Sequence, residues 1–479
     1  MRQHTQAVTG LALTLLVGSC ASGPALPTAP ENFASIQALA AGDPALTAAP
    51  SPGWVDALGV EEVNGFVREA LRANPELNAA TGRAQAARAR ARGSWGGLLP
   101  DLNISFGRSR TETPIPGTDD RTRADLTTGT LSSTWEVDIW GRLSARALAS
   151  DSNADALEAD LDAARLSVAG QAARFWVSMN EAQQVLALAQ EDLATRNRAL
   201  DITQRRYDRG IADSLALRTA RSQTASARAG EAQAREGALV AARRLQETLG
   251  RYPDGSLRAG AALPVLPALQ AAGAPRDLLE RRPDVRAAES RLHAAGFRVH
   301  EARAALLPRL TISASADGTG AQLSDIADVD GLITTVLAGL TAPLFRGGEL
   351  RAEARAASAE QRTAAANYVT TALAAWREAE AAISNDASLA VREQELASAA
   401  DEAREAQSLA ERQYAGGVAT IFELIDAYTR RIDAQRALIA TRADRVRNRI
   451  DYHIALGAGA MTGGVADTAP APATQGQAQ

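Results

Sequence analysis

Side chains that could perform catalysis or bind a metal are few in this chain of 479 residues, which has four histidines and one cysteine. His293 and His300 lie seven residues apart on one face of a predicted helix, but neither is accompanied by a cysteine or a pair of carboxylates. The sequence also lacks the glycine-rich phosphate loop and the nucleophile elbow of hydrolases. It therefore argues against an enzyme and predicts neither a cofactor nor a metal site.

The single cysteine, Cys20, follows a sequence that is typical of a secretory signal peptide. The apolar run 11–17 is too short for a permanent transmembrane helix. The motif Leu-Val-Gly-Ser-Cys that ends at Cys20 resembles a bacterial lipobox, in which the cysteine is acylated and becomes the mature N-terminus. We therefore expect a lipoprotein signal peptide over 1–19 and palmitate on Cys20, the alternative being a plain cleaved signal. Ala21, in place of Asp, predicts sorting to the outer membrane.

Charge argues against a nucleic-acid partner. The net charge is −5, and the basic residues, all arginine, are interspersed with Asp and Glu. Proteins that bind nucleic acid usually gather their basic residues into a stripe or patch. Low-complexity composition at both ends predicts a lipidated extended arm over 20–53 and a disordered C-terminal tail over 459–479.

The rest of the chain is an internal duplication. Two proline-led segments of equal length, 75–100 and 283–308, both end in Leu-Leu-Pro. A Tyr-x-x-Gly motif follows in each half and keeps nearly the same register. The long period indicates a duplicated half-protein and not a solenoid. We therefore predict a first structural repeat over 54–260 and a second over 261–458.

Long helices are predicted in both repeats. No proline interrupts 117–252 or 344–469, and helix-favouring Ala, Arg, Glu, Gln and Leu dominate these stretches. The glycines of the Tyr-x-x-Gly motifs can end one helix and reverse the chain into the next. We therefore expect one long helical hairpin over 142–250 and another over 348–457.

Two further segments alternate apolar and polar residues with a period of two. Leu102 and Ile104, for example, alternate with polar neighbours. This pattern is typical of transmembrane β-strands that have one face toward lipid and the other toward a wet lumen. We expect β-hairpins at about 101–140 and 309–343, the alternative being surface hairpins on a soluble protein.

Four strands cannot close a barrel with a usable lumen, and open sheet edges are forbidden in hydrocarbon. Three chains with four strands each would form a closed barrel of twelve strands. Trimerisation would also give the alanine-rich helices the neighbours they need, because each buries little apolar surface alone. The sequence therefore predicts a mainly α fold with a transmembrane β-barrel portion in a homotrimer.

Together these features resemble the TolC-like outer-membrane factors of tripartite efflux pumps, especially the OprM-like lipoprotein branch. The resemblance spans about 54–458 and also depends on the stretches 135–142 and 342–348. It implies a lipid-anchored trimer whose β-barrel lies in the cell outer membrane and whose long α-barrel extends into the periplasm. It further implies export of drugs or other toxic small molecules through a tunnel with a periplasmic iris gate.

The resemblance also implies partners: a periplasmic adaptor (membrane fusion) protein, an inner-membrane transporter of the resistance-nodulation-division type, and outer-membrane lipid. The hairpin tips are then expected to contact the adaptor. Without the resemblance, the tips are only helix breaks. The candidate contact residues are Tyr207, Gly210 and Ser214 in the first tip and Tyr414, Gly417 and Thr420 in the second.

A gate residue follows from the same resemblance. Family members narrow the tunnel with an acidic residue about a dozen positions beyond the second tip tyrosine, where this chain has Asp426. Three copies around one axis would repel each other and attract cations, while Arg430 or Arg431 could pair with them and hold the iris shut. The arginine of the family near position 429 is Thr429 here, so that bond must be rewired or absent. An ordinary solvated helix face is the alternative.

Other functions remain open at this point. An outer-membrane channel for type I protein or peptide secretion would share the same architecture. A periplasmic adaptor lipoprotein is less consistent with the sequence, because adaptors have one helical hairpin and extended β-domains. A soluble coiled-coil scaffold would leave the alternating segments unexplained.

Overall fold

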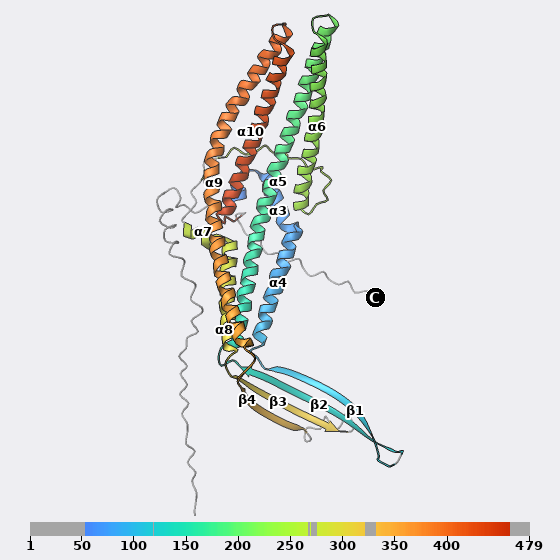
Figure 1. Ribbon diagram of the computed structural model, residues 1–479, viewed down its shortest axis with the longest axis vertical. Helices are drawn as coiled ribbons and strands as arrows, with labels where there is room; N and C mark the ends of the chain where they lie inside the picture. Colours follow the sequence, from blue (N-terminus) through green and yellow to red (C-terminus); the bar gives the residue numbers. More distant parts are fainter. Residues whose placement is uncertain (1–52, 118, 267–268, 270–274, 321–331, 460–479) are drawn as a thin grey trace, which may run out of the picture. The chain divides into compact units, whose positions relative to one another are not determined.

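The computed structural model describes residues 53–117, 119–266, 269, 275–320 and 332–459 (Figure 1). The predicted signal peptide, Cys20 and the C-terminal tail beyond 459 lie outside the described residues. The described part is mainly helical with one small sheet, as predicted. Its elements are α2 (Trp54–Ala57), α3 (Glu61–Ala73), α4 (Pro75–Gly96), β1 (Asp101–Pro114), β2 (Arg121–Val137), α5 (Arg142–Asp208), α6 (Ser214–Thr248), α7 (Pro275–Arg281), α8 (Pro283–Ala304), β3 (Arg309–Gly320), β4 (Ile333–Thr341), α9 (Glu349–Ala415) and α10 (Ile421–Ala455).

The duplication is visible in the helix bounds. The outgoing helices α5 and α9 have 67 residues each, and the return helices α6 and α10 have 35 each. Their first residues repeat at one offset, since 349 − 142 = 207 and 421 − 214 = 207. At 1.5 Å per residue, each outgoing helix is about 100 Å long. Within the described ranges, no helix combines the length and the hydropathy of a membrane-spanning segment.

The described residues form two compact units, and both repeats contribute to each of them. Gly93–Ser150 and Leu292–Ala365 form one, which we call the sheet unit. The other, the helical unit, contains 53–92, Asp151–Arg291 and 366–459. The long helices α5 and α9 each begin in the sheet unit and continue into the helical unit.

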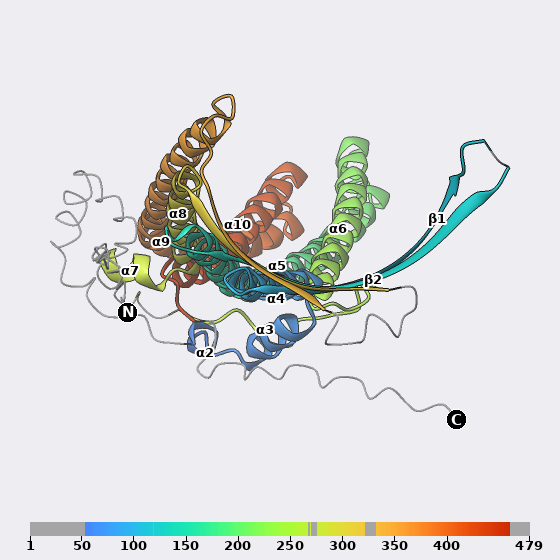
Figure 2. The same cartoon turned by 90° about the horizontal axis from the view of Figure 1, so that it is seen from below.

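The sheet unit holds an antiparallel sheet in the order β1-β2-β3-β4, seen edge-on as a curved ribbon in Figure 2. Residues directly opposite each other in antiparallel strands share a face. The register pairs Ile104 with Leu131 and Leu310 with Leu340, and it aligns the alternation of all four strands. One face therefore carries Leu102, Ile104, Phe106, Leu131, Trp135, Val137, Leu310, Ile312, Val336 and Leu340. The other face is mostly polar: it carries Asn103, Ser105, Ser132, Thr134, Thr311, Ser313 and Thr335, together with the apolar Leu126, Ile333 and Leu337.

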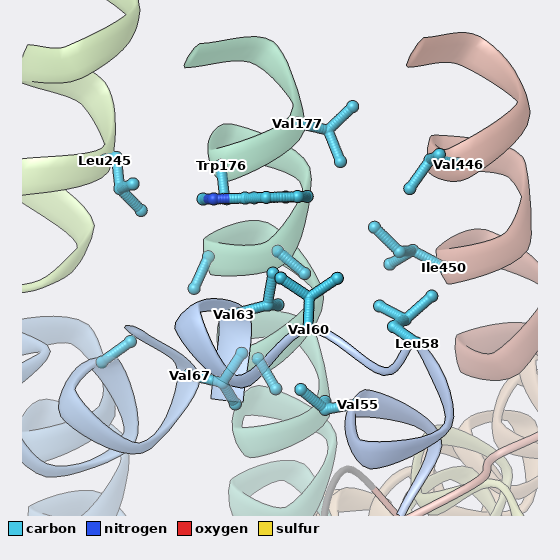
Figure 3. Packing of buried hydrophobic residues seen from close by; sticks show 14 of the residues in the cluster. Val55, Leu58, Val60, Val63, Val67, Trp176, Val177, Leu245, Val446 and Ile450 are labelled. Atoms are coloured by element: carbon cyan, nitrogen blue, oxygen red, sulfur yellow. The ribbon is translucent and has the colours of Figure 1, made fainter. Parts of the chain in front are cut away.

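The main core of the helical unit forms where α3 packs against the long helices (Figure 3). Val63 and Val67 of α3 contact the cluster that contains Trp176 of α5, Leu245 of α6 and Ile450 of α10, and all five side chains are almost fully buried. Gly170 lies where α5 approaches α10, and a Cβ there would lie 2.1 Å from Ile454 Cδ1, so a larger residue would displace the Ile454 side chain. This core holds the hairpins side by side and so fixes where their tips lie within the unit.

Candidate gate and partner-contact site at the helical tips

Both hairpins reverse direction through the same backbone device. Tyr207 and Gly210 lie in the first tip (206–214), and Tyr414 and Gly417 lie in the second tip (413–421). The two glycines have left-handed φ angles of 70° and 80°. Their N–H groups donate to the tyrosine carbonyls, at 2.9 Å in the first tip and 3.1 Å in the second. The Tyr-x-x-Gly motif thus ends each outgoing helix, since a glycine adopts this conformation without strain.

The return helices begin with different caps. In the first tip, the side chain of Asp213 accepts a hydrogen bond of 2.8 Å from the N–H of Ala216, and Ser214 is the first residue of α6. In the second tip, Thr420 and Glu423 form a capping box. The Glu423 carboxylate accepts bonds from the Thr420 N–H and hydroxyl, at 2.6 and 3.0 Å. These bonds lower the pKa of Glu423, with the backbone N–H as the larger cause.

Large apolar side chains are exposed at both tips. Their exposed fractions range from 41% for Tyr207 to 82% for Val418. Apolar groups clustered at the ends of long polar helices are a common mark of a protein–protein contact. The exposed apolar residues are Tyr207 and Ile211 in the first tip and Val418 in the second, with Leu215 and Phe422 directly after the tips in the first turns of α6 and α10.

The second tip tyrosine is instead buried, and the first hairpin holds it. The hydroxyls of Tyr414 and Thr203 lie 2.7 Å apart in a hydrogen bond. The Arg206 guanidinium lies 4.8 Å from the centroid of the Tyr414 ring and donates to the Tyr414 carbonyl. A buried hydroxyl pair and a cation over an aromatic ring together link α5 to the second tip.

A small apolar core lies beneath this link. Leu424 and Tyr428 of α10 are 1% and 4% exposed and pack in the same cluster as Tyr414. Burial raises the pKa of Tyr428 above its ordinary value, and the neighbouring Glu411 carboxylate adds to this effect. The phenol therefore stays neutral, and the base of the second tip is a packed structure.

The predicted gate residues lie on two different faces of α10. Asp426 and Arg430 form an ion pair at 2.7 Å, and their side chains are 60% and 75% exposed. Hydrogen bonding to Asp426 raises the pKa of Arg430. The carboxylate therefore already has a cation on its own helix, where an exposed pair adds little stability. The hydroxyl of Thr429 donates to the Ile425 carbonyl at 2.9 Å and does not replace the family arginine.

Arg431 is not brought together with Asp426. Its side chain is 4% exposed and pairs with Glu191 of α5 at 2.8 Å. It also donates to Gln435 at 3.1 Å. Within the single chain, Arg431 therefore binds α10 to α5, and only Arg430 is close to the predicted acidic residue.

Three residues of this site were not identified from the sequence: Thr203, Arg206 and Glu191. Their partners lie more than two hundred positions away in the other repeat, so local spacing does not reveal them. One signal was available for Arg206, because the corresponding residue of the second repeat is the uncharged Gln413. A charge retained in only one of two duplicated tips points to a contact that only one tip makes.

Histidines take part in packing in the described part of the chain. His300 Nε2 lies 3.1 Å from the Trp140 carbonyl, and His453 stacks on Trp54 with ring centroids 6.0 Å apart. Burial lowers the pKa of His453 to about 4, so it is neutral at physiological pH. No group of three potential metal ligands occurs among the described residues.

Comparison with known proteins identifies the family. The profile of the outer membrane efflux protein family matches twice, over residues 66–251 and 274–458, which together cover most of the chain and follow the duplication. The chain belongs to the outer membrane efflux protein family. This membership places it in the outer membrane, as the outer-membrane component of an efflux system.

Relatives of this efflux protein match along nearly the whole chain. The pyoverdine export outer membrane protein OpmQ of Pseudomonas putida is 30% identical, over 94% of this chain and 96% of that protein. The toluene efflux pump outer membrane protein TtgF, also of Pseudomonas putida, is 26% identical, over 82% of each chain. The solved structure of the outer-membrane channel OprN has a TM-score of 0.79 and 26% identity, and covers 88% of this chain and 96% of that chain.

Proposed function

We propose that three copies of this efflux protein form a closed tunnel that passes small toxic molecules from a periplasmic pump assembly to the cell exterior. The sheet carries this proposal. Its strands share one apolar and one mostly polar face, and among the described residues of one chain β1 and β4 each have an edge with no strand partner. In hydrocarbon the backbone groups of those edges must be paired. The edge strands of neighbouring copies can pair with each other, and three copies then close a barrel of twelve strands. The tunnel performs no chemistry of its own.

The tips are the proposed contact with the partner proteins. The exposed apolar side chains at both tips would be buried by a periplasmic adaptor, which in turn connects the tunnel to an inner-membrane transporter of the resistance-nodulation-division type. The proposed adaptor-contact residues are Tyr207, Gly210 and Ser214, and Tyr414, Gly417 and Thr420. Tyr414 is buried in the single chain, so it supports the contact surface from beneath.

Cell fractionation combined with gel mobility tests the tunnel. The full chain should sediment with the outer membrane and run on an unboiled gel as a detergent-stable trimer that becomes monomeric on boiling. A protein that fractionates as a water-soluble monomer after delipidation would eliminate the tunnel. A Cys20→Ser variant should lose palmitate labelling and membrane yield, and unchanged labelling would refute the lipid anchor.

The gate proposal concerns Asp426 and its partner Arg430. If three Asp426 carboxylates face the axis, Asp426→Asn should raise conductance in planar bilayers and reduce cation selectivity. Arg430→Gln should increase cation selectivity, because it removes a positive charge and leaves the carboxylates in place. Opposite shifts support an acidic ring, whereas unchanged selectivity in both variants removes these residues from the gate.

Substrate class remains a family-level proposal. The relatives are named for cargoes as different as pyoverdine and toluene, which fits a wide polar lumen that selects weakly. Drugs and other small toxic compounds are therefore the proposed cargo. Type I secretion of a protein or peptide is the second candidate, and deletion of the gene with assays of drug susceptibility and secreted protein separates the two.

A further inference from the structure

A pocket rich in arginine lies in the sheet unit, between the end of α8 and the start of α9. Its volume is about 590 Å³. Arg303 and Leu306 line it from the α8 side. Arg351, Arg355, Ser358 and Arg362 line it from α9.

The α9 residues form one continuous stripe. Arg351, Arg355 and Arg362 follow the four- and seven-residue spacing that keeps side chains on one helix face. The acidic residues of the same segment, Glu349, Glu353 and Glu360, are each two positions from an arginine of the stripe, or about 200° around the helix. The start of α9 therefore has a basic face and an acidic face that point in opposite directions.

The pocket arginines have no carboxylate partner in the described part of the chain. Neighbouring arginines of the same unit are paired: Arg142 binds Glu136 at 2.8 Å, and Arg146 binds Glu301 at 2.7 Å. No such pair exists among the described residues for Arg303, Arg351, Arg355 or Arg362. Four arginine side chains that line one hollow without a counter-charge would attract an anion.

The pocket also lies at the border of the apolar sheet face. Leu310 and Leu340 are paired at the start of β3 and the end of β4 and belong to that face, and Leu306 lies four residues before Leu310. In the connection from β4 to α9, Phe345 is 88% exposed. Arg351 is the third residue of α9, so it lies only about 3 Å along the helix axis from its start. The lipid headgroup layer on each side of a bilayer is about 5 to 8 Å thick, and arginine side chains can extend into it.

We propose that this pocket binds the phosphate of an anionic glycerophospholipid at the periplasmic face of the membrane that holds the sheet. The guanidinium groups would bind the phosphate oxygens in pairs, the Ser358 hydroxyl would add a hydrogen bond, and Leu306 would lie against the glycerol and the first acyl carbons. The proposal rests on the insertion of the sheet proposed above. The fractionation test addresses that insertion separately, so the two can fail independently.

Native mass spectrometry of the full chain in a non-ionic detergent tests the site. The probes are phosphatidylglycerol and phosphatidylcholine with identical acyl chains. The parent protein should retain phosphatidylglycerol preferentially. Each arginine near a membrane surface contributes about a five-fold gain in affinity for anionic lipid. A triple variant with Arg351→Gln, Arg355→Gln and Arg362→Gln should therefore bind phosphatidylglycerol about a hundred-fold more weakly.

A matched control separates the pocket from general charge. Arg392→Gln removes an exposed arginine from the same helix outside the pocket, and it should leave lipid retention within about two-fold of the parent. Thermal melting checks that each variant folds. If the triple variant does not fold, the single variant Arg355→Gln should still show a loss of about five-fold.

Three results would overturn the proposal. Equal retention of both lipids would show that the pocket does not select for the negative charge of the headgroup. Competition by the same concentration of glycerol 3-phosphate would show that a free anion, not a membrane lipid, is the ligand. A parent protein that retains no phosphatidylglycerol would show that other groups, such as carboxylates of a second copy, already fill the pocket.

Discussion

The two helical tips descend from one duplicated motif, but their tyrosines have different surroundings. Tyr207 is 41% exposed, whereas Tyr414 is 3% exposed and bonded to Thr203. The position that corresponds to Thr203 in the second repeat is Ala410, which has no hydroxyl to offer Tyr207. Of the two tip tyrosines, Tyr414 therefore links the hairpins of one chain and Tyr207 has no matching hydroxyl opposite it.

The difference between the two tips shows which contacts hold them together. Arg206 reaches from the first hairpin to the second, while the corresponding Gln413 has no charge with which to reciprocate. The first hairpin thus supplies the hydrogen-bonding and cationic groups, and the second supplies the aromatic ring. Tyr207 remains available for contact with another protein. In the proposed trimer, we expect the link inside each chain to be stronger than the contacts between the tips of neighbouring chains.

Truncation of the two tyrosines is the most severe test of this comparison. Tyr414→Ala removes a buried ring and should destabilise the tip by about 3 to 5 kcal/mol. Tyr207→Ala removes an exposed ring and should change the stability of the isolated protein by less than about 1 kcal/mol. Hydrogen exchange of the amides in 413–421 and 206–214 measures both effects. Equal loss of protection in the two variants would contradict the assigned difference in burial.

Making the first tip resemble the second gives the next largest effect. Arg206→Gln introduces the residue that the second repeat has, and it removes the guanidinium from the Tyr414 ring and carbonyl. We expect a loss of about 1 to 3 kcal/mol in local stability, because a charged hydrogen bond and a cation–π contact are both broken. Planar-bilayer recordings should then show more frequent opening.

Arg209→Gln is the matched control, since Arg209 is an exposed arginine of the same tip. It removes the same charge from the tip without removing the contact. A similar increase in opening in both variants would mean that the charge of the tip, and not the bond to Tyr414, keeps the hairpins together.

The fold was largely predictable because its signals are local and occur twice. Proline-free stretches predicted α5 and α9, and alternation predicted the sheet whose register places Ile104 opposite Leu131. The Tyr-x-x-Gly motifs predicted both reversals, since only the local backbone decides where a left-handed residue is required. The residues at which α5 and α9 pass from the sheet unit into the helical unit were not predicted, because they depend on packing between repeats.

The site was less predictable for the same physical reason. Sequence spacing brought Asp426 and Arg430 together, because four residues is one helical turn. It could not decide between Arg430 and Arg431, since that choice depends on which face of α10 packs against Glu191 of α5. Adjacent positions on a helix point about 100° apart, so one of the two is buried between helices while the other remains in solvent.

The glycines of the second tip provide a finer test. Gly417 has a left-handed φ of 80°, whereas Gly416 does not have a positive φ. Gly417→Ala should therefore cost about 1 to 2 kcal/mol. Gly416→Ala should be neutral or slightly stabilising, because alanine lowers the conformational entropy of the unfolded chain. The rate of proteolytic cleavage at the tip reports both changes. Faster cleavage of the Gly416→Ala variant than of the Gly417→Ala variant would contradict the assignment of the left-handed turn position to Gly417.

Acidification should loosen the second tip through its capping box. The pKa of Glu423 is lowered in the folded protein because its carboxylate accepts two bonds from Thr420. A carboxylate whose pKa is lowered by folding stabilises the folded state at a pH above the ordinary glutamate pKa of about 4.3. This stabilisation is lost as the pH falls through the lower pKa of the folded protein. Protection of the Thr420 amide, corrected for intrinsic exchange, should be constant from about pH 8 to 5 and decrease below about pH 4.

A Glu423→Gln variant is the control for this pH effect. Its side-chain carbonyl can still accept from the Thr420 N–H, but it does not titrate, so the amide should show weaker protection that is independent of pH. The first tip has Ala216 at the corresponding position and cannot form the box. If the parent and the variant lose protection over the same pH range, the titration of another group must loosen the second tip. The capping box would then not account for a difference between the two tips.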